Sequence, residues 1–296
     1  MQPEKPGFIL GGGGALGANS VGFLWAAEDY GILNPTYIQG SSVGGIIGAK
    51  LAEMGGTGSR VLRDIFLDVE RRGPSALFPA YDPIWHWSST HLFRNRGIRR
   101  LVDMIDAETL IRSPVHLDIV TIRDQTESHK YFTNRDPLFQ DQPERIKDAI
   151  LASASIPGFL PPIQIEDRFY SDGRHVSIQR AIDFGCDCIF IFFNGPRNRA
   201  KDAQPEFDSW QKRLFGMSTG DRVAIEELRR LRRAKSSKFV AFRSPWTTKT
   251  FAVMEWRACT DFERGELNKK GDIELAMEHA YECAMNVFRR KFPKEI

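Results

Sequence analysis

The chain has 296 residues, of which 42% are hydrophobic and 27% charged, and its 41 basic and 38 acidic residues give a net charge of +3. This composition excludes wholesale disorder, and no apolar run reaches the ~20 residues of a membrane-spanning helix. Four cysteines are too few for a disulfide framework, and the first residues lack the pattern of a secretory signal. We therefore expect a soluble, cytoplasmic protein of the α/β or α+β class, with signal-independent export left open.

The N-terminal part of the sequence alternates between short strands and helices. Gly7–Leu10 is an apolar run before a series of glycines, and apolar residues at helical spacing follow over about 15–30. A second strand is predicted over 36–39 and a second helix, rich in small residues, over 43–54. A βαβα beginning favours a parallel sheet that is covered by helices on its faces.

The later elements are predicted from the same periodicities. Strands are expected over 115–122, 130–133, 162–165, 188–193 and 238–242, and helices over about 59–71, 98–106, 143–153, 177–184, 221–233 and 272–291. The aromatic segment 73–96 is interpreted as a long loop, either a lid over a site or a packed surface loop. We expect one domain over 1–296, with a motif-bearing core over about 7–193 and a helical, basic extension over 194–296.

A glycine-rich loop follows the first predicted strand. Residues 12–17, Gly-Gly-Gly-Ala-Leu-Gly, match the G-x-G-x-x-G pattern of dinucleotide-binding loops. That pattern also requires an acidic residue after the second strand, and none occurs between Gly31 and Ala52. A P-loop fails as well, because no Gly-Lys-Ser/Thr closes the run. What remains is a loop whose backbone N–H groups can face a small anion at the start of a helix.

The second strand ends in a serine motif. Residues 40–44, Gly-Ser-Ser-Val-Gly, form a G-x-S-x-G sequence between a predicted strand and a predicted helix, which is the context of a nucleophile elbow. Ser42 would then stand at a helix N-terminus, whose dipole favours the negative charge that develops during nucleophilic attack. The alternative is that these glycines and serines only make tight turns in a binding module.

A serine nucleophile needs a base, and the histidines after Ser42 have no recognisable sequence context. Asp172 is a different candidate, because it follows a short strand and precedes Gly173, whose tight turn could hold the carboxylate rigidly at a sheet edge. A carboxylate can take the serine proton directly if burial raises its pKa. Spacing alone does not distinguish Asp172 from any other Asp-Gly turn.

Four blocks together resemble the patatin-like phospholipase family. They are residues 11–17, 40–44, 152–162 and 172–173, in the order and spacing of the family, and the resemblance covers roughly the first two-thirds of the chain. The resemblance implies a three-layer α/β/α sandwich with a mainly parallel central sheet, and a Ser–Asp dyad without histidine. It also implies that residues 152–162 shape the base of an acyl pocket.

The resemblance assigns roles residue by residue. It makes Ser42 the nucleophile and Asp172 the base. The backbone N–H groups of the glycine loop would form the oxyanion hole, and further motif glycines would support the turns. The oxyanion glycines are Gly12, Gly13 and Gly14, and the supporting glycines are Gly17, Gly40, Gly44 and Gly173.

The implied activity is lipid acyl hydrolysis, by a phospholipase A or another carboxylic ester hydrolase, through an acyl-serine intermediate. Two alternatives stay open: an acyltransferase that uses the same acyl-serine, and a non-catalytic lipid-binding protein. No cofactor is expected. No metal is expected either, because zinc-ligand spacing is absent and Cys186-x-Cys188 is tighter than the usual C-x-x-C. The head group, chain length and oligomeric state are not determined by the sequence.

Two basic features bear on the partner. Arg174 stands where the family usually has Gly or Ala, and we hypothesise that it contacts the phosphate of a head group; the alternative is that the turn simply tolerates this side chain. Residues 211–243 contain ten basic and three acidic residues, which suits peripheral contact with an anionic membrane surface. The alternative is a solvated helix face with ion pairs to Glu226 and Glu227. Nucleic acid is not expected, because no aromatic residues interleave with the basic run.

Overall fold

The computed structural model describes residues 4–77, 79, 93–124, 128–173, 176–193, 252–257 and 271–291. Several features predicted from the sequence lie outside these residues. They are Arg174, the basic segment 211–243 with its predicted helix and strand, and most of the aromatic segment 73–96.

The described strands form one mixed, eight-stranded sheet in the order β5-β6-β3-β2-β1-β7-β8, with β4 paired to β3. The strands are β1 (Pro6–Leu10), β2 (Tyr37–Ser41), β3 (His116–Arg123), β4 (Ser128–Thr133), β5 (Ile163–Ile165), β6 (Arg168–Asp172), β7 (Cys188–Phe193) and β8 (Ala252–Arg257). The five strands from β3 to β8 in this order are parallel, whereas β4, β5 and β6 run antiparallel to their partners. The expected α/β class with a mainly parallel sheet is confirmed.

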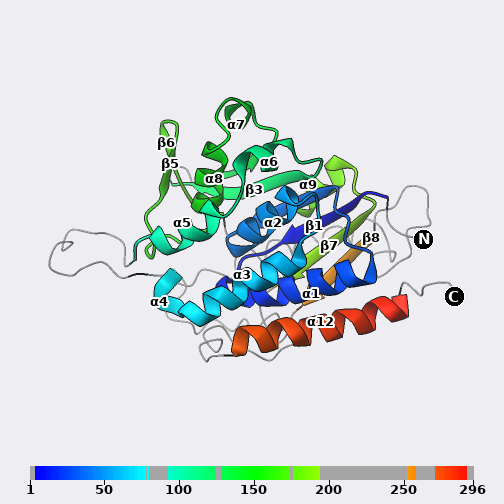
Figure 1. The fold of residues 1–296 in the computed structure, drawn as a ribbon. Helices are drawn as coiled ribbons and strands as arrows, with labels where there is room; N and C mark the ends of the chain where they lie inside the picture. Colours follow the sequence, from blue (N-terminus) through cyan, green and yellow to red (C-terminus); the bar gives the residue numbers. More distant parts are fainter. Residues whose placement is uncertain are drawn as a thin grey trace, which may run out of the picture.

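Helices lie on both faces of the sheet (Figure 1). The described helices are α1 (Gly17–Tyr30), α2 (Val43–Glu53), α3 (Ser59–Arg72), α4 (Pro74–Leu77), α5 (Arg96–Asp103), α6 (Ala107–Arg112), α7 (Pro137–Asp141), α8 (Arg145–Ser153), α9 (Ile178–Phe184) and α12 (Asp272–Lys291), with a short 3₁₀ helix, η1 (Gly14–Leu16), before α1.

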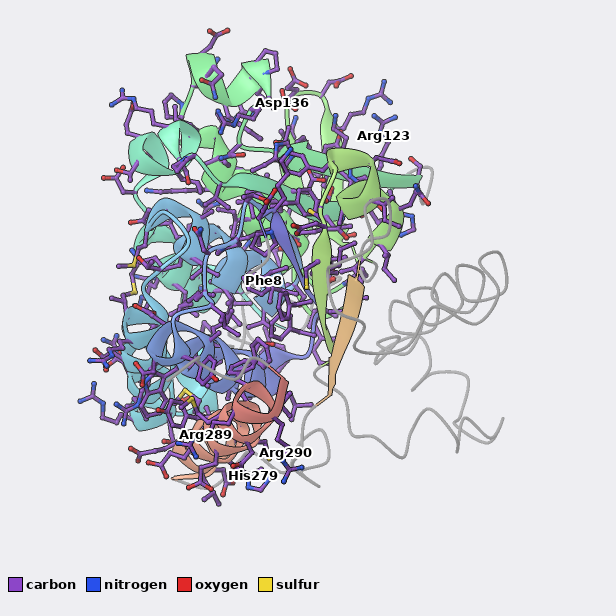
Figure 2. The ribbon with its side chains drawn as sticks, turned by 90° about the vertical axis from the view of Figure 1, so that its right-hand side faces the viewer. Phe8, Arg123, Asp136, His279, Arg289 and Arg290 are labelled. Carbon is purple, nitrogen blue, oxygen red and sulfur yellow. The ribbon has the colours of Figure 1, made fainter. Side chains whose placement is uncertain are left out.

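The central strands are apolar on both faces, as strands buried between two helical layers must be. On β1, Phe8 and Leu10 point into the larger core, which contains the buried faces of α1, α2, α8 and α12. Ile9 between them points to the opposite face, where it packs with Ile178 and Ala181 of α9. Figure 2 shows Phe8 in the middle of the molecule.

The C-terminal helix α12 packs lengthwise against α1, although most of the chain separates them (Figure 1). Its buried residues share one face of the helix: Ile273, Ala276, Met277, Ala280, Ala284 and Phe288. A Cβ at Gly22 of α1 would lie 2.1 Å from the Met277 carbonyl oxygen, so glycine allows the two helices to approach closely. His279, Arg289 and Arg290 project from the outer side of α12 (Figure 2).

The helix expected over 98–106 corresponds to α5, which ends earlier than expected, and the short helix α6 that follows it was not expected. Helix α5 ends at Asp103, and α6 begins at Ala107. The break occurs because the Asp106 side chain accepts a hydrogen bond from the Thr109 amide, 3.0 Å away, and so caps a new helix. Aspartate competes with helical backbone hydrogen bonds and favours this N-cap position.

Candidate active site

Ser42 stands at the junction of β2 and α2 in a strained conformation. Its φ of 58° is one of two positive φ values among the non-glycine residues that the structure describes, and such a conformation costs an L-residue of order 1–3 kcal/mol. The Ser42 amide donates a hydrogen bond to Oγ of Ser153, 3.0 Å away, and the Ser42 carbonyl accepts one from the Gly45 amide at 2.9 Å, which starts α2. This is the geometry of the strand–turn–helix elbow expected from the G-x-S-x-G motif.

The motif glycines of the elbow lie where backbones touch. A Cβ at Gly40 would be 2.3 Å from the Gly44 carbonyl oxygen, and a Cβ at Gly44 would be 2.2 Å from the carbonyl oxygen of Leu10. Neither obstacle is a side chain that can move aside. The elbow therefore needs glycine at both positions, because α2 begins in contact with both β1 and β2.

The glycine loop lies directly beside Ser42. A Cβ at Gly12 would be 3.0 Å from the Cβ of Ser42 and 3.7 Å from its Oγ. The loop is tied to β7 by a hydrogen bond from the Gly11 amide to the Phe192 carbonyl, at 3.2 Å. Gly13 and Gly14 have positive φ values of 153° and 59°. Their amides find no hydrogen-bond acceptor among the residues that the structure describes, so they are suited to receive an anion.

Two helix N-termini converge at this point. Helix α2 begins after Ser42, and η1 and α1 begin with the glycine loop. The two starts are in contact, since a Cβ at Gly17 would lie 3.0 Å from the Val43 side chain. Each helix N-terminus carries about half a positive charge from its aligned peptide dipoles. The surroundings of Ser42 thus favour a developing negative charge.

Strand register brings Asp172 to the same place. Ser41 pairs with Val120 of β3, and Asp172 pairs with the next β3 residue, Thr121. Strand β4 pairs with β3 along residues 118–123, and a strand has only two edges, so β2 and β6 must share the other one. The end of β6 therefore meets the end of β2, which makes Asp172 the neighbour of Ser41 and Ser42.

The turn that carries Asp172 is held on several sides. The Asp172 amide donates a hydrogen bond to the Ser155 carbonyl, 2.9 Å away, and the residue is only 5% exposed. A Cβ at Gly173 would lie 2.5 Å from the Val120 carbonyl oxygen, so glycine allows the turn to press against β3. Arg174 lies outside the described residues.

Two supporting residues were missed by the sequence analysis. Ser153 donates a hydrogen bond to the Val120 carbonyl at 2.7 Å while it accepts the one from Ser42, and it belongs to the block 152–162 that drew attention only as part of an acyl pocket. His129 of β4 hydrogen-bonds the backbone of Gly173, and burial lowers the pKa of His129 below 6.5, an effect that this bond partly opposes. Both contacts join residues far apart in sequence, so local spacing gave no sign of them.

Within the described ranges, no three His, Cys, Asp or Glu side chains gather as metal ligands would. Cys186 and Cys188 are free and buried. Burial raises the pKa of each thiol to about 12, with a smaller contribution from the charge of Asp187. They pack as small apolar side chains in the core.

The family model described as patatin-like phospholipase matches residues 8–175, a span that holds the glycine loop, the elbow and Asp172. The chain belongs to the patatin-like phospholipase family. Family membership indicates lipid acyl hydrolysis. A comparison with curated protein sequences gave no match. No helix in the part of this patatin-like chain that the structure describes is both long and apolar enough to span a membrane.

Solved structures with a similar arrangement include two bacterial proteins. VipD from Legionella pneumophila is 13% identical with a TM-score of 0.45, and the match covers 98% of this chain and 67% of VipD. ExoU in complex with SpcU, from the type III secretion system of Pseudomonas aeruginosa, is also 13% identical with a TM-score of 0.45. That match covers 99% of this chain and 54% of ExoU, so this chain spans about half of that protein.

Proposed function

We propose that this protein hydrolyses carboxylic esters of lipids through an acyl-serine intermediate, with Ser42 as the nucleophile and Asp172 as the general base. The observation that supports this most directly is the strand register, which makes Ser42 and Asp172 neighbours at one edge of β3. The strained φ of Ser42 and its contact with Gly12 add the two other parts of an acyl-transfer site, a presented nucleophile and adjacent backbone donors.

The proposed reaction has two halves. In the first, the Asp172 carboxylate takes the proton of Ser42 Oγ while Oγ attacks the ester carbonyl carbon, and the carbonyl electron pair moves onto oxygen. Collapse of this intermediate breaks the bond to the alcohol, which leaves with the proton from Asp172. In the second half, water gives a proton to Asp172 and attacks the acyl carbon, and Ser42 recovers its proton as the fatty acid departs.

The oxyanion of both halves would be held by backbone N–H groups of Gly12, Gly13 and Gly14. One such donor typically contributes about 3 kcal/mol to the transition state. The N-termini of α1 and α2 add a favourable field at the same point. The environment of Ser42 is therefore suited to the charge that forms on the substrate oxygen.

The dyad is tested with Ser42→Ala and Asp172→Asn on phospholipid and neutral ester substrates. We expect each variant to lose at least about 10³-fold in kcat while its thermal unfolding stays close to that of the wild type. Ser41→Ala and Asp167→Asn are matched controls, since Asp167 is exposed in the β5–β6 turn, and both should keep full turnover. Robust turnover by Asp172→Asn would contradict its role as the base.

A fluorophosphonate probe and product analysis separate the alternatives. Labelling of the wild type but not of Ser42→Ala supports an activated serine, whereas a wild type that binds lipid without labelling or turnover would be a lipid-binding protein. Transfer of the acyl chain to an added alcohol in preference to water would identify an acyltransferase. Both discriminations use the intact chain.

The contact of Arg174 with a substrate phosphate is a proposal that rests on the sequence. Arg174→Ala should reduce turnover of a phospholipid more than that of a neutral ester, because the lost interaction is with the phosphate charge. Equal losses on the two substrates would contradict it.

The proposed membrane contact of residues 211–243 is tested by sedimentation with anionic and neutral vesicles at two salt concentrations, since salt screens that attraction.

A further inference from the structure

A series of hydrogen-bonded polar side chains crosses the face of the sheet that α9 covers. Asp118 of β3 accepts hydrogen bonds from Tyr37 Oη at 2.8 Å and from Arg180 Nε at 2.7 Å. Tyr37 Oη in turn accepts one from Gln39 Nε2 at 2.9 Å. Tyr37, Gln39 and Asp118 are each at most 1% exposed, so the bonds among these three side chains are buried, whereas Arg180 reaches Asp118 from the partly exposed rim.

This series of hydrogen-bonded side chains ends at the backbone of Ser177. The Ser177 amide donates to Gln39 Oε1 at 2.5 Å, and Gln39 Nε2 donates to the Ser177 carbonyl at 3.2 Å. The side-chain amide of Gln39 thus pairs with one residue through both its oxygen and its nitrogen, much as a neighbouring strand would. Ser177 is fixed to β2 by this pair.

The orientation of the Gln39 amide is determined by its neighbours. The Tyr37 hydroxyl has one proton and gives it to the Asp118 carboxylate, so toward Gln39 it can only accept. This places the NH₂ group of Gln39 against Tyr37 and leaves its oxygen for the Ser177 amide. Asp118 is held by Arg180 and His116 as well, so this series of side chains has a single hydrogen-bonding arrangement.

The pairing of Gln39 with Ser177 joins the segment that carries Ser42 to the segment that carries Asp172. Gln39 is three residues before Ser42 on β2, and Ser177 is five residues after Asp172. We propose that Gln39 is a positioning residue, which ties Ser177, five residues after Asp172, to the strand that presents Ser42. This inference rests on the proposed function, because it gives Gln39 a role in keeping the base beside the nucleophile.

The test compares Gln39→Leu with a matched control at the edge of the same sheet. Asn134 is also a fully buried amide that pairs with backbone groups, namely those of Leu117, Leu110 and Val115. It follows β4 and lies beside the beginning of β3, at the end of that strand away from the site. We expect Gln39→Leu to lower kcat between about 10- and 100-fold with KM little changed, since misplacement of about 1 Å can cost that much. Asn134→Leu should lower the melting temperature at least as much and keep kcat within about threefold.

Two additions keep the proposal falsifiable if Gln39→Leu folds poorly. Gln39→Glu retains the shape and an acceptor for the Ser177 amide, and we expect it to keep more kcat than Gln39→Leu. Hydrogen exchange of the peptide over 172–178 should become faster in both Gln39 variants and stay unchanged in Asn134→Leu. Unchanged kcat and unchanged exchange in the Gln39 variants, or equal losses of kcat in the control, would overturn the positioning role. A wild type without any turnover would instead overturn the proposed function itself.

Discussion

Ser42 and Ser153 are joined by a hydrogen bond of 3.0 Å from the Ser42 amide to Ser153 Oγ, although 111 residues separate them in sequence. Ser153 also donates to the carbonyl of Val120, the β3 residue that pairs with Ser41. One hydroxyl therefore satisfies two buried backbone groups at the turn where Ser42 has its strained φ. The elbow is therefore stabilised by a residue that lies outside the G-x-S-x-G motif.

Replacing this hydroxyl should affect both stability and turnover. In Ser153→Ala the Ser42 amide and the Val120 carbonyl lose their partner, which should cost about 1–3 kcal/mol of unfolding free energy and about tenfold in kcat as the elbow relaxes. Urea unfolding and ester turnover measure the two effects.

The matched control for Ser153 is Ser113. Its hydroxyl also bridges two buried backbone groups, the carbonyl of Ala52 and the amide of Val115, but far from Ser42. Ser113→Ala should therefore lose similar stability without loss of kcat. A Ser153→Ala variant that behaves like this control would show that the hydroxyl contributes stability alone.

Two motif glycines should respond differently to alanine. A methyl at Gly12 would meet the Ser42 side chain at 3.0 Å, so Gly12→Ala should reduce turnover by at least about tenfold with less than about 1 kcal/mol lost in stability. A methyl at Gly44 would lie 2.2 Å from the Leu10 carbonyl oxygen, which forces α2 away from β1. Gly44→Ala should lose more than about 3 kcal/mol. Thermal unfolding and turnover of the two variants test the contrast, and equal loss of stability would refute it.

The Asp118 carboxylate should make stability depend on acid pH. Burial acts to raise its pKa, but hydrogen bonds from His116, Arg180 and Tyr37 and the Arg180 charge outweigh it, so the pKa lies below the ordinary value of 3.8. The folded state then binds the proton less readily than the unfolded state. The resulting stability is complete above the unfolded pKa and is lost as pH falls through the folded pKa.

Asp118→Asn isolates this contribution, because asparagine keeps the shape but cannot ionise. At about pH 7 the variant should be less stable by about 2–4 kcal/mol, since a buried charged acceptor is removed from Arg180 and Tyr37. The difference from the wild type should shrink as pH falls below 3.8. Urea midpoints measured from about pH 7 to about pH 3 check it. A difference that stays constant over this range would contradict the assignment.

Much of the fold could be predicted because its signals are local. The strand over 188–193 and the helix over 272–291 were expected with the bounds that the structure has, since a continuous apolar run and a three-to-four-residue apolar spacing each specify one kind of element. Helix α6 was missed because its six residues are too few for a helical spacing of apolar residues to stand out. The Asp-Gly turn at residue 172 carried no more local information than any other such turn.

The sequence by itself determined the class of protein and the residues worth testing: an ordinary globular chain whose glycine loop, G-x-S-x-G elbow and Asp-Gly turn follow one another in the order of a known family. Tertiary structure alone decided that these motifs meet. Ser42 and Asp172 become neighbours because β2 and β6 use the same edge of β3. Ser153 and His129 reach the site from distant parts of the chain, and Gln39 is joined there to the distant Ser177. Register and packing depend on contacts over more than a hundred residues, which no local spacing encodes.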